Sequence, residues 1–477
     1  MSPRLLSVDE ARARVLGAIR WPLPAEILPV GEALGRVLAG PVVAETDLPP
    51  WDNSAMDGYA VLASDVVLAS EEAPLLLPIV GEVAAGARAE VTLRPGTAVR
   101  IATGAPLPPG ADAVVPVEDT TPLDAAGLPS GGRGGAAIGP LPAGCLVHAA
   151  VAPGANVRRR ADDLAAGTVI LPSGRALGPV EMALVAGAGV GRVAVHRRPR
   201  VAVISTGDEL RPAGGPLGPA GIPDANGPGL VALATAAGAE ARHLGIAPDN
   251  LGAVVATLRV AIAEADLVLV SGGVSVGPYD VVRTAFEEIG SVELWRVAVQ
   301  PGKPFAFGVA PRADTGPADA GAATEGAGAE GAAAEGAGPG QPSGPQPGGP
   351  PVFLFGLPGN PVSVFVTFEL FVRPALRRLS GRPDADLLRP VARAVLAESV
   401  SKAPGRRGFL RVVAERDGPF GAVRRDGAGR AIVRTAGGQG SHVLSALAAA
   451  DALAIVPESA DSLPAGAEVE LWWLDRA

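Results

Sequence analysis

Cysteine, histidine and lysine are scarce in this chain of 477 residues. The single cysteine, Cys145, excludes an internal disulfide framework and a thiolate metal cluster. The four histidines have no metal-ligand spacing, so any catalytic metal is expected to be a hard cation held by oxygen ligands. Nearly all basic residues are arginines. The two lysines, Lys303 and Lys402, are therefore candidates for positions that need a compact ammonium group.

Long apolar runs are also lacking, since none reaches the roughly 18 residues of a membrane span. The first 20 residues lack a secretory apolar core and instead predict a helix, in which Ser7 and Glu10 are spaced as a capping box. We therefore expect a soluble, cytoplasmic protein without a membrane partner. The net charge of -9 argues against nucleic acid as the main partner.

The length and the 48% hydrophobic content predict several domains with large cores. Residues 47–154 carry short β-rich runs broken by glycine and proline, and alternating runs return after residue 380. The predicted domains are an N-terminal linker domain (1–46 and 155–196), an inserted β-rich domain (47–154), a central α/β domain (197–379) and a C-terminal β-barrel-like domain (380–477).

Strand and helix patterns alternate in the central domain, which predicts βαβ units and a parallel sheet covered on both faces. Ligands of such sheets bind outside the carboxyl ends of the strands. Residues 311–351 interrupt the domain with a Gly/Ala/Pro-rich, nearly repetitive stretch. It predicts a disordered surface loop between two strands, with a tethered interaction segment as the alternative.

The stretch SGGVSVGPYD at 271–280 follows an apolar strand and precedes a helix pattern. Its glycines and serines could present amides and hydroxyls to an anion: Ser271, Gly272, Gly273, Ser275 and Gly277. Asp280 conflicts with that interpretation unless it holds a divalent cation that bridges the anion. A tight turn with an N-capping aspartate is the alternative.

Two more acidic positions follow strands of the same predicted sheet, Glu209 in STGDEL and Asp249 in APDN. Each alone is typical of a cap or turn. Together with Asp280 they predict carboxylates that converge on one edge of the sheet, where they could hold a divalent cation.

Two further turns fit an anion site. Lys303 stands in QPGKPFAF just before an apolar strand, where its ammonium could meet a phosphate or an oxyanion. In LPGNP, Pro361 suits the first position of a helix whose amides are free. A solvated loop lysine and a purely structural helix start are the alternatives.

The loops at 49–61 and 156–163 crowd acidic and basic side chains, which indicates either a salt-bridged surface or an anion clamp. At this point the motifs resemble one family. DNSAMDGYAV, RIATGAPLPPGADAVV, VRRRADDLAAGTV, STGDEL, SGGVSVGPYD, QPGKPFAFG, LPGNPVS and GQGSH stand in the order seen in molybdopterin molybdenumtransferases, the MoeA proteins and the gephyrin E domain.

The resemblance covers nearly the whole chain outside 311–351. It implies an enzyme of molybdenum cofactor biosynthesis that inserts molybdate into adenylyl-molybdopterin with Mg²⁺ and releases AMP. It also implies an elongated homodimer whose sites use both chains, and the molybdopterin adenylyltransferase as a candidate partner. Tungstate could replace molybdate, since the two oxyanions are nearly isosteric.

Carried over by motif, the resemblance implies roles for particular residues. The implied catalytic and metal-site residues are Asp57, Thr103, Glu209, Asp249, Asp280 and Lys303. The implied substrate-binding residues are Arg158, Asp163, Ser271, Gly272, Gly273, Ser275, Gly277, Pro358, Gly359, Asn360 and Pro361, with Arg406 and Ser441 for molybdate.

The chain departs from the family where lysines are common, with Arg296 and Gln300 in their places. Arginine keeps the charge at 296, whereas Gln300 is given no cationic role. Two rival functions are a gephyrin-like scaffold and a relative of the molybdopterin adenylyltransferases. The first would need a long partner-binding linker, and the second would use only the 199–378 domain and leave the other motifs idle.

Overall fold

The computed structural model describes residues 5–135, 139–274, 281–312, 350–418 and 421–474, without the side chains of 293–295. The chain forms two compact units, each with hydrophobic cores of its own. The first unit comprises Met1–Glu26, Gly35–Ala39 and Val195–Ala477, and the second comprises Ile27–Leu34 and Gly40–Ala194. Among the described residues no helix has both the length and the apolar character needed to cross a bilayer.

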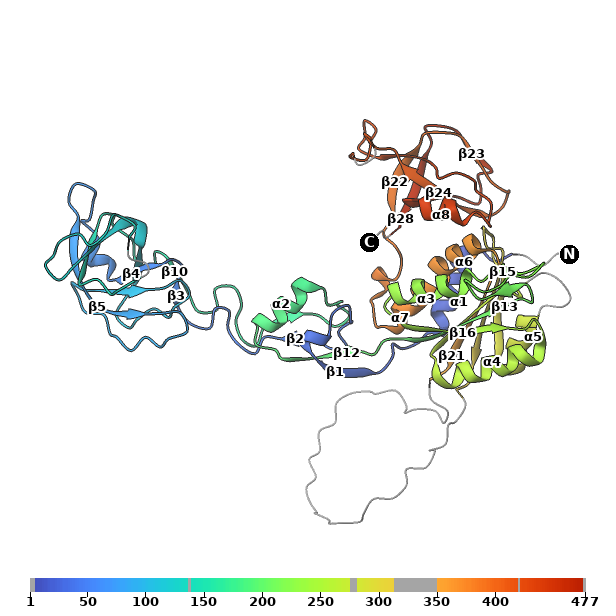
Figure 1. The fold of residues 1–477 in the computed structure, drawn as a ribbon, viewed down its shortest axis with the longest axis horizontal. Helices are drawn as coiled ribbons and strands as arrows, with labels where there is room; N and C mark the ends of the chain where they lie inside the picture. The colour runs from blue at the N-terminus through green and yellow to red at the C-terminus, as the bar shows by residue number, and fades with distance from the viewer. Residues whose placement is uncertain (1–4, 136–138, 275–280, 313–349, 419–420, 475–477) are drawn as a thin grey trace, which may run out of the picture. The chain divides into compact units, whose positions relative to one another are not determined.

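A six-stranded sheet forms the centre of the first unit (Figure 1). Its strand order is β16–β13–β17–β21–β20–β18. Its strands are β13 (Arg200–Thr206), β16 (Glu240–Ala247), β17 (Leu267–Ser271), β18 (Ser291–Arg296), β20 (Pro304–Ala310) and β21 (Val352–Leu357). Strands β16, β13, β17 and β21 run parallel to one another, whereas β20 pairs antiparallel with both β21 and β18. The predicted central parallel-sheet α/β domain is confirmed, with this edge as an addition.

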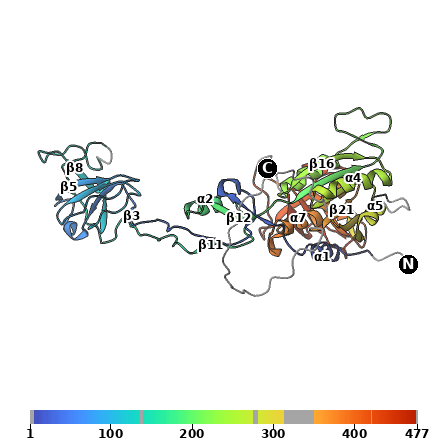
Figure 2. The same ribbon diagram turned by 90° about the horizontal axis from the view of Figure 1, so that it is seen from below.

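Helices cover both faces of the sheet. On one face lie α1 (Val8–Ala18), α3 (Asn226–Ala236), α6 (Pro361–Thr367), the π-helical η4 (Phe368–Val372) and α7 (Arg373–Leu379). On the other lie α4 (Leu251–Glu264) and α5 (Val281–Ile289). Figure 2 shows α1 and α4 on opposite sides. Strand β17 is fully buried: Leu267 and Leu269 pack in one core, and Val268 and Val270 pack in the other. Because both faces of this strand are apolar, helices must cover both faces of the sheet.

The predicted capping box begins α1. The Ser7 hydroxyl accepts a bond from the Glu10 amide (3.1 Å), and the Glu10 carboxylate accepts one from the Ser7 amide (2.8 Å). Val8 and Val15 are fully buried on the inner face of the helix. The N-terminal helix therefore belongs to the core of the first unit.

The C-terminal part of the first unit forms a closed five-stranded barrel. Its strands are β22 (Ala392–Leu396), β24 (Arg407–Ala414), β25 (Ala431–Thr435), β26 (Ala452–Val456) and β28 (Glu468–Trp473), and the pairing of β24 with β26 closes it. Shorter elements accompany it: β19 (Val299–Gln300), which pairs with β24, β23 (Val400–Ser401), β27 (Ser462–Leu463), η5 (Asp384–Asp386) and α8 (Leu444–Ala449). The predicted β-barrel-like domain is confirmed.

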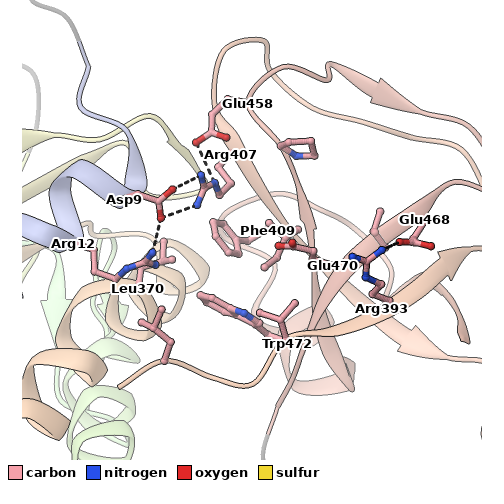
Figure 3. A pocket seen from close by; sticks show the side chains of 15 residues that line it. Asp9, Arg12, Leu370, Arg393, Arg407, Phe409, Glu458, Glu468, Glu470 and Trp472 are labelled. Atoms are coloured by element: carbon pink, nitrogen blue, oxygen red, sulfur yellow. Dashed lines mark hydrogen bonds and ion pairs between the residues drawn. The ribbon is translucent and has the colours of Figure 1, made fainter. Parts of the chain in front are cut away.

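A pocket of about 600 Å³ lies between α1 and this barrel (Figure 3). Asp9 on α1 pairs with Arg407 on β24 (Oδ2–Nη2, 2.7 Å), and the bond from Arg407 is the main cause that holds the pKa of Asp9 below its ordinary 3.8. The rings of Phe409 and Trp472, 5.5 Å apart, also line the pocket. An ion pair and an apolar contact surface thus join helix and barrel.

A second six-stranded sheet forms the centre of the second unit, in the order β7–β4–β6–β5–β9–β8. Its strands are β4 (Gly58–Val61), β5 (Leu75–Val83), β6 (Ala98–Ile101), β7 (Ala113–Pro116), β8 (Thr120–Leu123) and β9 (Gly144–Val147). Cys145 lies fully buried in its core, and burial raises the pKa of the thiol to about 12. This sheet confirms the predicted β-rich domain.

The remaining elements of the chain are short. They are β1 (Ala25–Pro29) with β12 (Arg192–His196), β2 (Val42–Val43) with β11 (Val169–Leu171), β3 (Asn53–Ser54) with β10 (Val157–Arg158), β14 (Leu210–Arg211) with β15 (Ile222–Pro223), α2 (Pro179–Gly187), η1 (Val30–Glu32), η2 (Ala63–Val66) and η3 (Val117–Asp119).

Candidate functional site

Two glycines after β17 lie against the end of β13. Gly272 has a φ of +99°, and a Cβ there would stand 2.1 Å from the carbonyl oxygen of Thr206, so only glycine fits. The Gly272 amide donates to the carbonyl of Leu357 (3.2 Å). Within the SGG turn, the amide of Gly273 has no hydrogen-bond partner among the described residues.

The turns after β17 and β21 are tied together through Asn226. Its side-chain amide donates to the hydroxyl of Ser271 (2.9 Å) and to the carbonyl of Gly359 (2.6 Å). The Ser271 hydroxyl in turn donates to the carbonyl of Pro358 (3.3 Å). The SGG and LPGN motifs, some 85 residues apart, therefore meet at the carboxyl edge of the sheet, which we call the rim.

Sequence analysis did not identify Asn226, nor the residue that positions it. The carboxylate of Asp224 accepts bonds from the amides of Asn226 (3.0 Å) and Gly227 (2.9 Å), and so caps α3. Its other oxygen accepts a bond from the hydroxyl of Ser205, the penultimate residue of β13 (2.6 Å). The sequence around these two residues, DANG before a helix pattern, is typical of an ordinary turn and therefore gave no indication of their role.

Two of the three predicted carboxylates lie at the end of β13. The oxygens of Glu209 stand 2.7 and 2.9 Å from the position that a Cβ on Gly207 would take. Asp249 accepts a 3.5 Å contact from the hydroxyl of Thr206, and its Oδ1 lies 3.6 Å from the Cβ position of Gly273. Glu209 therefore lies beside Gly207 and Asp249 beside Gly273, both near the end of β13.

Asp280, Ser275 and Gly277 lie outside the described residues. In the described part of the chain no three His, Cys, Asp or Glu side chains group as metal ligands. The predicted set of three carboxylates therefore stays a prediction. Glu209 and Asp249 supply the oxygen donors that Mg²⁺ prefers.

The rim also meets the last predicted motif. The side-chain amide of Asn360 donates to the hydroxyl of Ser441 (2.9 Å), and the Val362 amide donates to the Ser441 carbonyl (3.1 Å). Asn360 precedes α6, which begins at Pro361 as predicted, but its side chain bonds Ser441 instead of capping the helix. The LPGNP and GQGSH motifs thus lie side by side.

A buried arginine holds the loop that carries Ser441. The guanidinium of Arg411 on β24 donates to the carbonyls of Gly438 (2.9 Å) and Gly440 (3.0 Å), and only 1% of the residue is exposed. Gln439 closes the loop through bonds with the backbone of Arg411 in both directions. Burial lowers the pKa of Arg411. The sequence feature that could have identified Arg411 is a charged residue inside the apolar strand GFLRVVA.

Lys303 and Arg406 are half-buried, and neither side chain bonds a described residue. Gly302, with φ of +111°, packs against Thr367 of α6, so the turn that precedes β20 stands over that helix. The side chain of Gln300 accepts a bond from the Ala403 amide (2.8 Å). A structural contact thus occupies Gln300, the residue given no cationic role.

The second unit brings together two of its predicted residues. Asp57 Oδ1 accepts bonds from the amide (2.7 Å) and the hydroxyl (3.0 Å) of Thr103. Arg158 pairs through β10 with Asn53 of β3, next to the same loop. Asp163 is exposed, and its backbone amide donates to the carbonyl of Leu48 (3.0 Å).

The three consecutive arginines of VRRRADD differ in their contacts. Arg159 donates to Asp52 (2.7 Å), while Arg160 pairs with Asp47 and its amide bonds Asp52 (2.8 Å). The backbone bond from Arg160 is the main cause that lowers the pKa of Asp52. Arg158 has no side-chain bond to a described residue and is exposed. Among the described residues, therefore, Arg158 is the one of the three arginines whose guanidinium has no protein partner and could bind a ligand.

Family models match almost the whole chain. The MoeA N-terminal region (domain I and II) matches residues 6–189, a probable molybdopterin binding domain matches 202–378, and the MoeA C-terminal region (domain IV) matches 393–474. The motifs that meet at the rim fall within the second and third matches.

Relatives of known name extend the match. The chain is 36% identical to molybdopterin molybdenumtransferase 2 of Mycobacterium tuberculosis, over 98% of this chain and 99% of that protein. It is 32% identical to molybdopterin molybdenumtransferase of Haemophilus influenzae, over 98% of both chains.

A solved structure agrees with this match. The molybdopterin biosynthesis MoeA protein from Pyrococcus horikosii is 29% identical, with a TM-score of 0.70 over 98% of this chain and 99% of that one. The order of motifs, the meeting of SGG, LPGN and GQGSH at one rim, and the full-length relatives lead to one conclusion. This chain belongs to the molybdopterin molybdenumtransferases, the transferase family of molybdenum cofactor biosynthesis.

Proposed function

We propose that this chain inserts molybdate into adenylyl-molybdopterin, in a Mg²⁺-dependent reaction that releases AMP and gives molybdenum cofactor. The observation that carries the proposal is the full-length relation to molybdopterin molybdenumtransferases, together with three family motifs that hydrogen-bond to one another at the rim. The enzyme is proposed to work in the cytoplasm as a homodimer and to receive its substrate from the molybdopterin adenylyltransferase.

The residues of the rim divide into two proposed roles. The Gly273 amide and the Lys303 ammonium bind and orient the phosphate oxygens of the nucleotide, since both are donors without a partner among the described residues. Ser441 and Arg406 hold molybdate, the first through its hydroxyl and the second through its guanidinium. Asn360 fixes the hydroxyl of Ser441 at 2.9 Å and so sets its direction.

Glu209 and Asp249, with Asp280 as a proposed third ligand, are suited to hold Mg²⁺. They fit because both carboxylates flank the end of β13 beside the bare backbone of Gly207 and Gly273, where a phosphate can approach. The bound cation would neutralise charge on the phosphate oxygens of the nucleotide. Without it, the two carboxylates would repel the same phosphate.

The second unit is proposed to supply a further set of substrate contacts: Asp57, Thr103, Arg158 and Asp163. Asp57 accepts two bonds from Thr103, which leaves its second oxygen, Oδ2, available to a substrate donor. In a homodimer this set would meet the rim of the partner chain.

The reaction itself is the direct test. Purified protein is offered adenylyl-molybdopterin, molybdate and Mg²⁺, and AMP and active cofactor are assayed together. The proposal expects both products in equal amounts, and neither after Mg²⁺ is removed with a chelator. A tungstate arm shows which oxyanion is used, and light scattering gives the oligomeric state. Production of neither AMP nor cofactor from the intact substrate would contradict the proposal.

Variants test the carboxylates separately. Asp249→Asn and Asp280→Asn should each lower AMP release by about a hundredfold or more, because each removes charge where the metal and phosphate meet. Asp384→Asn is the matched control, since Asp384 is 81% exposed on η5, and it should leave the rate unchanged. Near-normal AMP release by Asp280→Asn would show that its assignment is wrong.

A further inference from the structure

A second cavity of the first unit is lined by arginine. It has a volume of about 270 Å³ and lies between segments 35–37 and 196–198 and the carboxyl ends of α3 and α7. No acidic side chain is among the described residues that line it. We call it the arginine pocket, after six of its lining residues: Arg36, Arg197, Arg198, Arg373, Arg377 and Arg382.

Carboxylates outside the pocket neutralise only part of this charge. Three of the arginines form ion pairs with carboxylates that do not line the pocket: Arg36 with Glu26, Arg197 with Asp266, and Arg373 with Glu369. Asp266 and Glu369 each pair with one more arginine outside the pocket, Arg312 and Arg389. The available negative charge is therefore shared among more arginines than it can balance.

Arg377 and Arg382 form no ion pair with a described residue. Arg377 donates to the carbonyls of Asp386 (2.6 Å) and Leu388 (3.5 Å), which satisfies donors but supplies no formal charge. Burial, followed by the repulsion of Arg373, Arg382 and other arginines, lowers the pKa of Arg377 to about 10. Arg377 and Arg382 thus add positive charge to the pocket without an ion pair to a described residue.

A buried donor points to the same conclusion. Arg36 is 9% exposed, and its Nε is buried without a hydrogen-bond partner. Such a group costs free energy unless a ligand or a water satisfies it. The carboxyl ends of α3 and α7 also attract cations. However, Arg36 donates to the carbonyl of His196, and Arg377 donates to those of Asp386 and Leu388. The hydrogen bonds of these two arginines therefore go to carbonyls outside the last turns of α3 and α7.

We propose that the arginine pocket binds a tetrahedral dianion, the chemistry shared by phosphate, sulfate, molybdate and phosphate monoesters. Guanidinium groups suit such ions because they offer planar, paired donors. None of the residues of the rim lines the pocket, so this site is additional to the proposed reaction site. A volume of about 270 Å³ admits one ion with water, or a small monoester, and excludes a large cofactor.

The test compares the full-length wild type with Arg382→Gln. Equilibrium dialysis and thermal unfolding are measured with inorganic phosphate, sulfate and molybdate, each against sodium chloride at the same ionic strength. The wild type should bind at least one of the dianions and unfold at a higher temperature in its presence. Arg382→Gln should bind it about tenfold more weakly, as expected from the loss of one charge-assisted contact.

In dianion-free buffer Arg382→Gln should not lower the unfolding temperature. Removing one like charge from the cluster should leave the unfolding temperature equal to that of the wild type or higher. Arg259→Gln is the matched control, because Arg259 is 70% exposed on α4, which covers the other face of the sheet, and does not line the pocket. It should match the wild type in both buffers. Arg377→Gln should reproduce Arg382→Gln where it folds.

Lys303→Ala separates this pocket from the rim, and should leave the dianion-dependent rise in unfolding temperature in place. Three results would overturn the proposal: no dianion effect beyond that of chloride, unchanged binding in Arg382→Gln, or loss of the effect in Lys303→Ala alone. The dianion that binds most tightly identifies the source of the ligand. The outcome does not depend on AMP release, so it can fail or succeed independently of the proposed reaction.

Discussion

Arg411 places a charge where the pattern of its strand calls for an apolar side chain. The residue is 1% exposed, yet its guanidinium finds two carbonyl partners in the loop at 438–440. Because both bonds come from one buried, charged group, the loop that presents Ser441 depends on this side chain. A residue that belongs to none of the predicted motifs thus determines the shape of one.

Arg411→Met tests this dependence. We expect the free energy of unfolding of the first unit to fall by about 2–4 kcal/mol, because the change removes two hydrogen bonds donated by a charged group to the loop. Urea denaturation measures it. Arg434→Met on the exposed face of β25 is the control and should change the value by less than about 0.5 kcal/mol. Equal effects of the two substitutions would refute the structural role of Arg411.

Asn226 is the second residue that sequence analysis missed. Asn226→Ala removes the donor that joins Ser271 to Gly359, so the SGG and LPGN turns should lose their relative position. We expect AMP release to fall about tenfold or more, since small misplacements at a site are costly. Thr257→Ala is the control: it removes a side-chain hydrogen bond to the carbonyl of Ala253 within α4, and should leave the rate unchanged. A normal rate for Asn226→Ala would contradict the role of the bridge.

At this scale the sequence predicted best those residues that stand in motifs. The contacts of Asp57 with Thr103 and of Asn360 with Ser441 join residues that were singled out separately. Asn226 and Arg411 could not be found in this way, because their importance lies in partners distant in sequence. Their own neighbourhoods read as a turn and as a strand.

At the scale of elements, alternation of strand and helix patterns was enough to predict the covered sheet. The antiparallel edge was not predictable, because the direction of β20 and β18 depends on pairing and not on composition. The π-helical turn η4 inside the helix that follows Pro361 was likewise missed, since its backbone pattern leaves no mark in hydrophobic periodicity.

One carboxylate anchors the start of β17. Asp266 accepts two bonds from Arg197 (2.6 and 2.7 Å), one from Arg312 (2.9 Å) and one from the amide of Arg200 (2.9 Å). Burial raises the pKa of Asp266, but the bonds from Arg197 and Arg200 outweigh it and hold the pKa below 3.8. The segment before β13 is thereby fixed to the next strand of the sheet.

Asp266→Asn should lower the free energy of unfolding by about 3 kcal/mol at pH 7, since it leaves two arginines unpaired. A carboxyl with a depressed pKa stabilises the fold above about pH 4 and ceases to do so as pH falls through its folded value. The difference from the wild type should therefore shrink between pH 4 and lower values. Urea denaturation at several pH values measures it, with the exposed Asp384→Asn as control. A constant difference would contradict the argument.

At the scale of the whole molecule, both units are built from separate stretches of chain, which composition alone does not reveal. The motif order carried that information, because each motif belongs to a domain of known kind. The division into a linker domain at 1–46 and 155–196 and an inserted domain at 47–154 remains a prediction.

The hairpin of β20 and β21 offers a test at this scale. Its strands pair up to Ala310 and Val352, so a short turn can replace residues 313–349 while Arg312 keeps its contacts. We expect unchanged AMP release and an unfolding free energy equal or higher by on the order of 1 kcal/mol, because a shorter loop has a lower closure entropy. Activity assays and urea denaturation check both. Loss of AMP release with a preserved fold would show that the segment takes part in the reaction.

The scarcity of lysine makes this protein unusually easy to label at a chosen side chain. An acylating reagent selective for primary amines has two side-chain targets, one in the turn before β20 and one in the loop after β23. Mass spectrometry of the labelled peptides can follow both at once, with Lys402 as the internal standard. Slower acylation of Lys303 in the presence of nucleotide or molybdate would then report occupancy directly, without any turnover.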